Sequence, residues 1–150
     1  MNHELVLSKE LRRLVESRLK STLRGIEETL QEVLERQEIG LEELKGTMKT
    51  LEISFNLLSQ RWSLQILYTL FLRNIMGFGE LKKVLDVNSR TLSDKLKTLK
   101  HHGYIGRFVE QGPPLRVKYS LTELGKNTIL LALPLLYYST DSSTEKARNG

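Results

Sequence analysis

The feature that most constrains this chain is the arrangement of leucines and charges between residues 89 and 102. Leu92, Leu96 and Leu99 are separated by four and three residues, so they share one face of an α-helix. The opposite face of that helix carries Arg90, Asp94, Lys97 and His101. A helix of this kind buries its leucines against a core and leaves its charged face accessible.

The neighbouring residues define where this helix starts and stops. Ser89 is a preferred N-cap residue after a turn at residues 86–88, and Gly103 suits the C-terminal end. Two β-prone runs follow, at residues 104–109 and 115–121, separated by a segment with one glycine and two prolines. This order predicts a β-hairpin with a stiff, exposed tip.

Apolar spacing predicts further helices around this unit. Upstream we expect helices at residues 48–59, 62–72 and 78–85. Gly40 and Gly46 are expected to make the chain more flexible before the first of these helices. Thr122 is expected to cap a last helix that runs from residue 123 to about residue 138 and bends or ends near Pro134. The side chains expected to face the core are Trp62, Ile66, Leu67, Leu70, Phe71, Phe78, Leu81, Val84 and Leu85.

The N-terminal part of the chain predicts a long helix at residues 8–38. Its apolar side chains follow the 4-3-4-3 spacing of a coiled-coil seam, at Leu19, Leu23, Ile26, Leu30 and Val33. Residues 9–24 hold six basic and two acidic side chains, whereas residues 25–50 hold three basic and seven acidic ones. These halves complement each other if two such helices pair antiparallel or if the segment folds back near Gly40. The third possibility is that the segment is a single amphipathic helix that packs along the domain.

The distribution of charge indicates a polyanion as partner. The net charge of the whole chain is +5, and residues 89–118 alone carry a net charge of +5, with seven Lys or Arg against Asp94 and Glu110. Everything outside this window is therefore neutral on balance. Positive charge concentrated on a neutral background is typical of nucleic-acid binding.

Composition argues against several other classes of function. The chain has no cysteine, which excludes disulfides and thiol chemistry, and no nucleophile–base pair or paired carboxylates stand out, so we do not expect an enzyme. The adjacent pair His101-His102 does not predict a metal site, because neighbouring side chains on a helix diverge. We expect neither a cofactor nor a membrane span, and we expect a cytoplasmic location. Nothing in the sequence marks an effector site.

A helix, a short helix, a tight turn, a third helix and a hairpin together are typical of a winged helix-turn-helix. In such a domain the third helix enters the major groove, and the hairpin, or wing, touches the flanking backbone. Arg90 near the start of the helix suits guanine, and Asp94 orients it or accepts from cytosine. The predicted DNA-binding side chains are Ser89, Arg90, Thr91, Ser93, Asp94, Lys97, Lys100, His101, Arg107, Arg116 and Lys118.

The stretch from about Ser54 to Tyr138 resembles the HxlR family of winged-helix transcription regulators, which share the MarR-type fold. The resemblance is carried by Trp62 with Ile66-Leu67, Phe78-Gly79-Glu80-Leu81, Ser89-Arg90-Thr91-Leu92-Ser93, Gly103-Tyr104-Ile105, Pro113-Pro114 and Arg116-Val117-x-Tyr119-Ser120-Leu121-Thr122-x-x-Gly125. The resemblance implies a homodimer from a bacterium or archaeon that binds operator DNA. Family members often carry a cysteine before the tryptophan; this chain has none, which excludes thiol sensing. Leu115, between Pro114 and Arg116, also departs from the family pattern.

The predicted fold is therefore mainly α-helical with a small β-hairpin: a winged helix-turn-helix domain at residues 49–138, a coiled-coil-like arm at residues 1–48 and a disordered tail at residues 139–150. The predicted function is sequence-specific binding of double-stranded DNA as a homodimer. The alternative is a winged-helix interaction module that assembles through its arm without reading DNA. Dimer contacts are expected at Leu19, Leu23, Ile26, Leu30 and Val33 of the arm and at Leu130, Leu131, Leu133 and Leu135.

Overall fold

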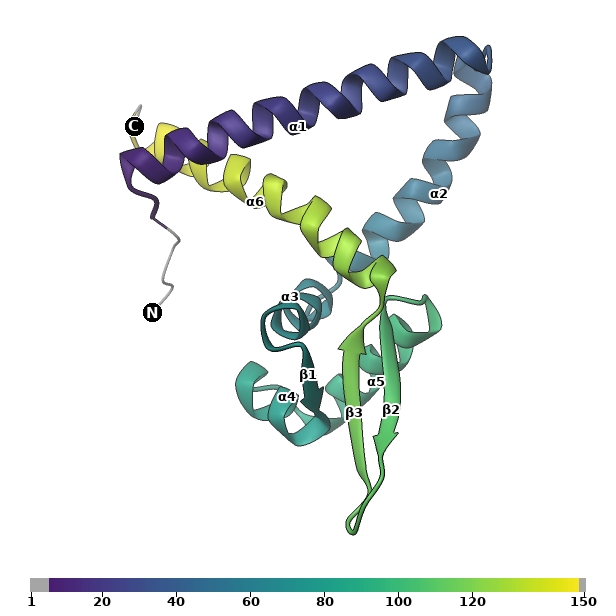
Figure 1. Cartoon of the computed structure of the whole chain (residues 1–150), viewed down its shortest axis with the longest axis vertical. Helices are drawn as coiled ribbons and strands as arrows, with labels where there is room; N and C mark the ends of the chain where they lie inside the picture. The colour runs from purple at the N-terminus through teal and green to yellow at the C-terminus, as the bar shows by residue number, and fades with distance from the viewer. Residues whose placement is uncertain (1–5, 149–150) are drawn as a thin grey trace. The chain divides into compact units, whose positions relative to one another are not determined.

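The computed structural model describes residues 6–148, the last ten of them (139–148) by their backbone alone. The described chain forms two compact units. One comprises the residues up to Glu52 together with those from Pro134 onward, and the other comprises Ile53–Leu133. Two helices, α2 (Leu41–Ser59) and α6 (Glu123–Arg148), contribute to both units (Figure 1).

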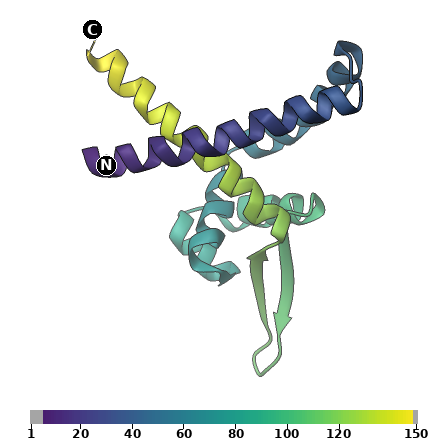
Figure 2. The same ribbon diagram turned by 45° about the horizontal axis from the view of Figure 1, so that its top comes forward.

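The unit Ile53–Leu133 is a helical domain with a small sheet. It contains the end of α2, then α3 (Ser63–Arg73), α4 (Phe78–Leu85), α5 (Ser89–His101) and the start of α6. The strands are β1 (Ile75–Gly77), β2 (Ile105–Glu110) and β3 (Arg116–Leu121). All neighbouring strands are antiparallel, in the order β1-β3-β2, and the β2–β3 hairpin extends beyond the helices in both views (Figures 1 and 2). This is the winged helix-turn-helix arrangement that the sequence predicts.

The core of this unit confirms most of the predicted inward positions. Ile66, Leu67 and Leu70 of α3 and Leu81 of α4 are at most 1% exposed, and Trp62, Phe71, Phe78 and Leu85 are partly buried against them. The prediction for Val84 is wrong, since its side chain is 54% exposed. α4 has only eight residues, and a helix that short turns a single narrow face to the core.

Several predicted boundaries also need correction. α2 begins at Leu41 rather than near residue 48, and Gly46 lies inside it with open space around its Cα. The short strand β1 was not predicted; its three residues are too few to show an alternating pattern. α6 contains Pro134 and continues to Arg148, whereas the sequence predicts disorder from residue 139. No glycine or proline interrupts residues 135–148, so a helix is compatible with that composition. Residues 149–150 lie outside the described part.

The start of α6 is fixed to the start of β2 by a close backbone approach. The Thr122 hydroxyl donates to the carbonyl oxygens of Gly103 (2.5 Å) and Tyr104 (3.1 Å) and accepts from the N–H of Gly125 (3.1 Å). This confirms Thr122 as the cap of the last helix. Gly125 lies so near Tyr104 that a Cβ at this position would collide with the Tyr104 carbonyl oxygen. Only glycine fits there.

The other unit contains α1 (Lys9–Arg36), which Ser8 caps by accepting from the N–H of Leu11 at 3.3 Å. The predicted long helix is therefore present. None of its residues is buried; Leu23, Ile26, Leu30 and Val33 are 41–52% exposed, and Leu19 is half-buried. The apolar seam thus has no complete cover within the described chain.

The leucines of α6 predicted to form a dimer contact are also accessible. Leu130, Leu131 and Leu135 are 43%, 67% and 55% exposed, and Leu133 is half-buried. Ile129, one turn before Leu133, is 3% exposed and belongs to the core. The apolar surface of α6 is therefore broader than its contact with the domain requires.

Replacing Gly125 by alanine should destabilise the domain, because α6 must move away from Tyr104 to make room for the methyl group. We expect the free energy of unfolding in urea to fall by roughly 1–3 kcal/mol. Gly79→Ala is the matched control, since Gly79 lies in α4 with nothing within 4 Å of an added Cβ. That variant should be neutral or more stable by up to about 1 kcal/mol. Equal effects of the two substitutions would contradict the proposed role of Gly125.

Candidate nucleic-acid interface

Helix α5 is anchored by its leucines and capped by an asparagine. Leu92, Leu96 and Leu99 are 0%, 2% and 0% exposed, so the predicted inner face is confirmed. The N-cap is Asn88 rather than Ser89: the Asn88 side chain accepts from the N–H of Thr91 at 2.8 Å. Asn88 has an extended backbone conformation and is as good a cap as serine, which is why the choice between these neighbours was ambiguous in the sequence.

The outer face of α5 carries the predicted contact residues. Ser89, Arg90, Asp94, Lys97, Lys100 and His101 are exposed, whereas Thr91 and Ser93 are half-buried. Among the ion pairs of residues 6–138, none joins Arg90 to Asp94, although the two stand one turn apart. The side chains at the start of the helix are therefore available to an external partner.

Two further polar side chains of this stretch belong to the flanks. Lys95 is half-buried and donates to the side-chain oxygen of Gln60 at 2.6 Å. His102 is the C-cap of α5, and its ring centre lies 5.3 Å from that of His101. This agrees with the sequence analysis, which placed neither residue among the contacts. In the part of the chain that the structure describes, His, Asp and Glu side chains form no group of three that could hold a metal ion.

The strand register places Arg107 on the side of the hairpin that faces α5. Arg107 on β2 is directly opposite Tyr119 on β3, and directly opposed residues in an antiparallel pair project from the same face. Tyr119 is buried, at 9% exposure, so this face is the inner one. Arg107 and Tyr119 line a hollow of about 350 Å³ together with Ser93, Leu96, Lys97 and Lys100 of α5. Three cations from two elements thus border one hollow.

Arg116 and Lys118 lie on the other face of β3, since they alternate with Val117 and Tyr119. Arg116 is exposed and pairs in register with Glu110. Lys118 is only 18% exposed in its side chain and forms an ion pair with Glu80 of α4 at 3.3 Å. The three cations predicted for the wing therefore divide into one beside α5, one exposed, and one held within the domain.

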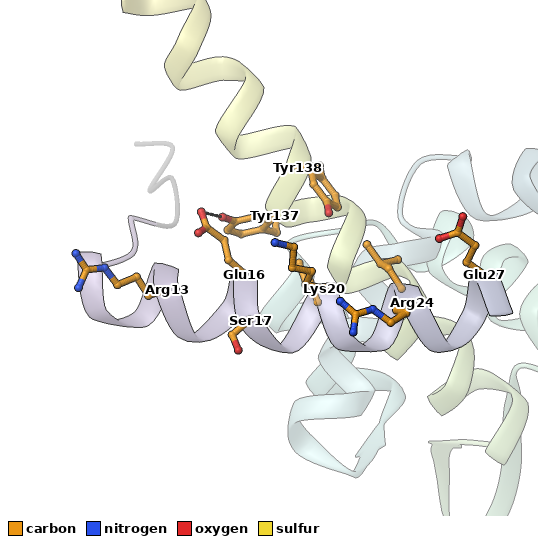
Figure 3. Close-up of a pocket in the computed structure, with 10 residues that line it drawn as sticks. Arg13, Glu16, Ser17, Lys20, Arg24, Glu27, Tyr137 and Tyr138 are labelled. Carbon is orange, nitrogen blue, oxygen red and sulfur yellow. Dashed lines mark hydrogen bonds between the residues drawn. The ribbon is translucent and has the colours of Figure 1, made fainter. Parts of the chain in front are cut away.

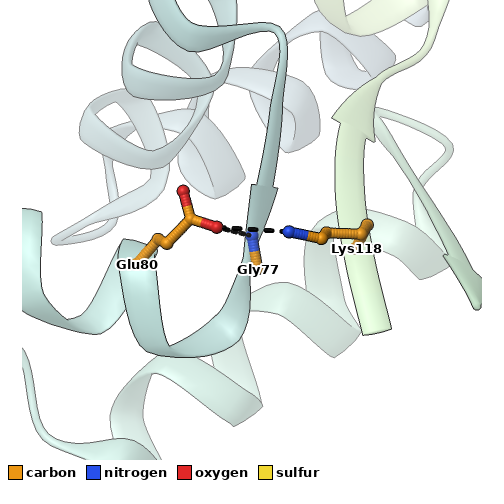
Figure 4. A network of polar contacts seen from close by, with 3 residues as sticks. All are labelled: Gly77, Glu80 and Lys118. Atoms are coloured by element: carbon orange, nitrogen blue, oxygen red, sulfur yellow. Dashed lines mark hydrogen bonds and ion pairs between the residues drawn. The ribbon is translucent and has the colours of Figure 1, made fainter. Parts of the chain in front are cut away.

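Glu80 connects three elements at this point (Figure 4). One of its carboxylate oxygens accepts from the N–H of Gly77, at the end of β1, at 3.3 Å and from the Lys118 ammonium on β3. Glu80 itself stands in the first turn of α4, where a carboxylate is favourable. The hydrogen bonds from Lys118 and Gly77 and the charge of Lys118, with a smaller contribution from the charge of Arg116, lower the pKa of Glu80 below its usual value.

The sequence analysis missed Glu80 and two lysines of the preceding helix. Nothing local in the sequence pairs Glu80 with Lys118, because they are far apart along the chain and meet only when β1 joins the sheet. Lys82 and Lys83 are exposed in the last turn of α4. Their adjacency was visible in the sequence, but they lie outside the basic window considered there.

The Glu80–Lys118 ion pair should make stability depend on pH. Because the pKa of Glu80 is lowered on folding, its contribution is present above the unfolded-state pKa and is lost as the pH falls through the lower folded-state value. Glu80→Gln should therefore be less stable than the unmodified protein at neutral pH, with a difference that shrinks in acid. Urea unfolding between pH 7 and pH 3 measures this. In a Lys118→Gln background the same substitution should show a much smaller pH-dependent difference; an unchanged difference would rule out Lys118 as the cause.

Comparison with known proteins places this arrangement in one family. The sequence model of the HxlR-like helix-turn-helix family matches residues 57–142. Relatives from Bacillus subtilis include the uncharacterised HTH-type transcriptional regulators YdzF, 35% identical over 51% of this chain and 71% of that protein, and YvaP, 37% identical over 50% and 69%. A solved transcriptional regulator of the MarR family from Enterococcus faecalis V583 superposes with a TM-score of 0.61 at 27% identity, over 67% of this chain and 92% of that one. More than half of the chain is matched by the family model, and the chain belongs to the HxlR-like helix-turn-helix family.

Proposed function

We propose that the protein binds operator DNA as a homodimer and reads it by inserting α5 into the major groove. The similar proteins are named as transcription regulators, and the family assigns this chain to transcription regulation of the HxlR type. No helix in the described residues is long and apolar enough to cross a membrane.

The observation that carries the proposal is the two-sided character of α5. Its leucine face is fully buried, so the helix cannot rotate without exposing core, and its polar face points outward in a fixed orientation. An α-helix with its side chains is about 10–12 Å across, which suits a major groove about 12 Å wide. A rigid helix with an accessible polar face is what insertion into the groove requires.

We assign different roles to the side chains along α5. Arg90 in the first turn is placed to donate two hydrogen bonds to a guanine, and Asp94 one turn later is placed to accept from a cytosine or to orient Arg90. Lys97 and Lys100 are further along and border the hollow with Arg107. Cations grouped in this way suit a phosphate of the DNA backbone, which sets affinity rather than sequence preference.

The strand register of the hairpin guides the roles that we assign to its cations. Arg107 joins Lys97 and Lys100, and exposed Arg116 reaches outward near the tip of the hairpin. Lys118 was predicted as a DNA contact, but we assign it a structural role, because its charge is paired with Glu80 and most of its side chain is covered. The exposed Lys82 and Lys83 of α4 are additional candidates for backbone contact.

Duplexes selected from a random pool supply the ligand for a first test. Binding by the unmodified protein should weaken steeply with salt, because each phosphate contact releases counterions. Arg107→Ala should lower affinity and reduce the slope of log K against log salt by about one. Lys118→Ala is the matched control on the same hairpin and should keep the slope, provided circular dichroism shows that it is folded. Salt-independent binding, or none, would favour the alternative of an interaction module that does not read DNA.

A second test separates base reading from backbone contact. Arg90→Ala should relax the preference at one base pair by about 1–3 kcal/mol, measured as the loss of discrimination against single-base variants of the selected duplex. Lys97→Ala, the control on the same helix, should weaken binding about equally for all sequences. Uniform weakening by Arg90→Ala would move Arg90 to the backbone contacts.

A further inference from the structure

We infer that α1 pairs with α1 of a second copy in an antiparallel arrangement whose centre lies between Arg24 and Gly25. The inference rests on the homodimer of the proposed function and concerns chiefly α1, which lies outside the region that the family model matches. Within the described chain, α1 has no buried residue, and its seam side chains Leu23, Ile26 and Leu30 are 41%, 49% and 52% exposed. A helix of 28 residues with an uncovered apolar seam needs a partner to bury it.

Charge selects the orientation of the two helices. Residues 9–24 carry six basic and two acidic side chains, and residues 25–36 carry four acidic and one basic. Parallel pairing would place basic beside basic and acidic beside acidic along the whole length. Antiparallel pairing places each basic half beside the acidic half of the second copy, which is the favourable arrangement.

The seam then selects the register. In antiparallel pairs each a residue meets a d residue of the partner helix. With the centre between Arg24 and Gly25, Leu23 meets Ile26 and Leu19 meets Leu30 of the second copy, each twice by symmetry. In this register Lys20 and Glu27 of the second copy flank the seam on the same side, offset by two residues or about 3 Å along the axis, which their long side chains can span. Both side chains are exposed, and among the described ion pairs neither has a partner.

The alternative registers are disfavoured by like charges. A shift of one heptad in one direction brings Glu27 opposite Glu27 of the second copy. The same shift in the other direction brings Lys20 opposite Lys20. Only the central register pairs Lys20 with Glu27, so the two side chains act together as a register signal.

The surface of α1 is hollowed in a matching way. Residues between Thr22 and Val33 line a shallow hollow formed by α1 alone, where Gly25 adds no side chain. The residues of α1 between Arg13 and Glu27 line a second groove, closed on one side by Tyr137 and Tyr138 of α6 (Figure 3). Tyr137 is held there by a 2.8 Å hydrogen bond from its hydroxyl to Glu16.

The proposed register places these two hollows opposite each other. Position 22 of one copy lies beside position 27 of the other, and position 33 beside position 16. Residues 22–33 of each copy, which line the first hollow, thus face residues 16–27 of the other copy, which line the second. Leu30 and Val33 of the second copy then approach the tyrosines of α6, so the arm interface includes both α1 and α6.

Cysteine crosslinking tests orientation and register together, because the chain has no cysteine of its own. The double variant Leu19→Cys, Leu30→Cys should form a disulfide-linked dimer on oxidation. An intrachain bond is excluded, because eleven residues of helix separate the two positions by about 16 Å, well beyond the reach of a disulfide. The single variants Leu19→Cys and Leu30→Cys are the controls and should not crosslink.

Crosslinking of either single variant to itself would show a parallel pair and overturn the inference. Absence of crosslinks in the double variant, with a dimeric mass in light scattering, would move the interface elsewhere and also overturn it. Binding of the selected duplex is measured for the unmodified protein and for the cysteine variants. If the unmodified protein binds the duplex but the double variant gives no crosslink, the proposed function stands and only the arm pairing is refuted. If the unmodified protein does not bind duplex DNA, the proposed function is refuted independently of the crosslinks.

A charge exchange tests the register signal without cysteine. Glu27→Lys should raise the dimer Kd several-fold, because the new lysine at position 27 of each copy would approach Lys20 of the other copy. This repulsion occurs twice by symmetry. The double variant Lys20→Glu, Glu27→Lys reverses both charges and should restore the Kd of the unmodified protein. Failure of the second substitution to rescue the first would contradict the Lys20–Glu27 contact.

Discussion

The burial of three leucines of α5 is the constraint on which the rest of the domain depends. Leu92, Leu96 and Leu99 are almost inaccessible, and each would cost a few kcal/mol to expose. The helix therefore has one rotational setting, which decides that Arg90 and Lys97 point outward. The hairpin follows directly after α5, and its buried Tyr119 packs in the same core. The orientation of the charged surface is thus a consequence of apolar packing, and electrostatics act only on side chains that the core has already positioned.

The same logic explains why equal charges on the hairpin are not equivalent. Arg107 and Lys118 are both cations on paired strands, but the alternation of a β-strand places them on opposite faces. On one face Arg107 borders a hollow shared with two lysines. On the other face Lys118 meets Glu80 and joins α4, β1 and β3 at one point. A partly covered lysine without a counter-charge would be costly, so the ion pair lets the sheet close over it. This cation stabilises the fold and is not free to meet an external partner.

Periodicity was sufficient for the parts of the fold that depend on one element at a time. The inner face of α5, the long helix α1 and the hairpin follow from spacing alone, and these predictions are confirmed. Strand β1 and the Glu80–Lys118 contact could not be read from the sequence, because they exist only once distant segments pair. The close contact of Gly125 with Tyr104 belongs to the same class. The individual DNA contacts stay predictions, since exposure permits a contact without specifying it.

The antiparallel pairing that we propose for α1 would separate the two ends of the arm, which a parallel pair would not do. In a parallel pair the two C-terminal ends of α1 would lie side by side. In the proposed register each end lies about 17 Å from the centre, so the two ends are about 35 Å apart. A self-complementary interface also generates two-fold symmetry, which an inverted-repeat operator shares. The pairing that we propose for α1 is thus compatible with two DNA-binding domains that meet the two halves of an inverted repeat.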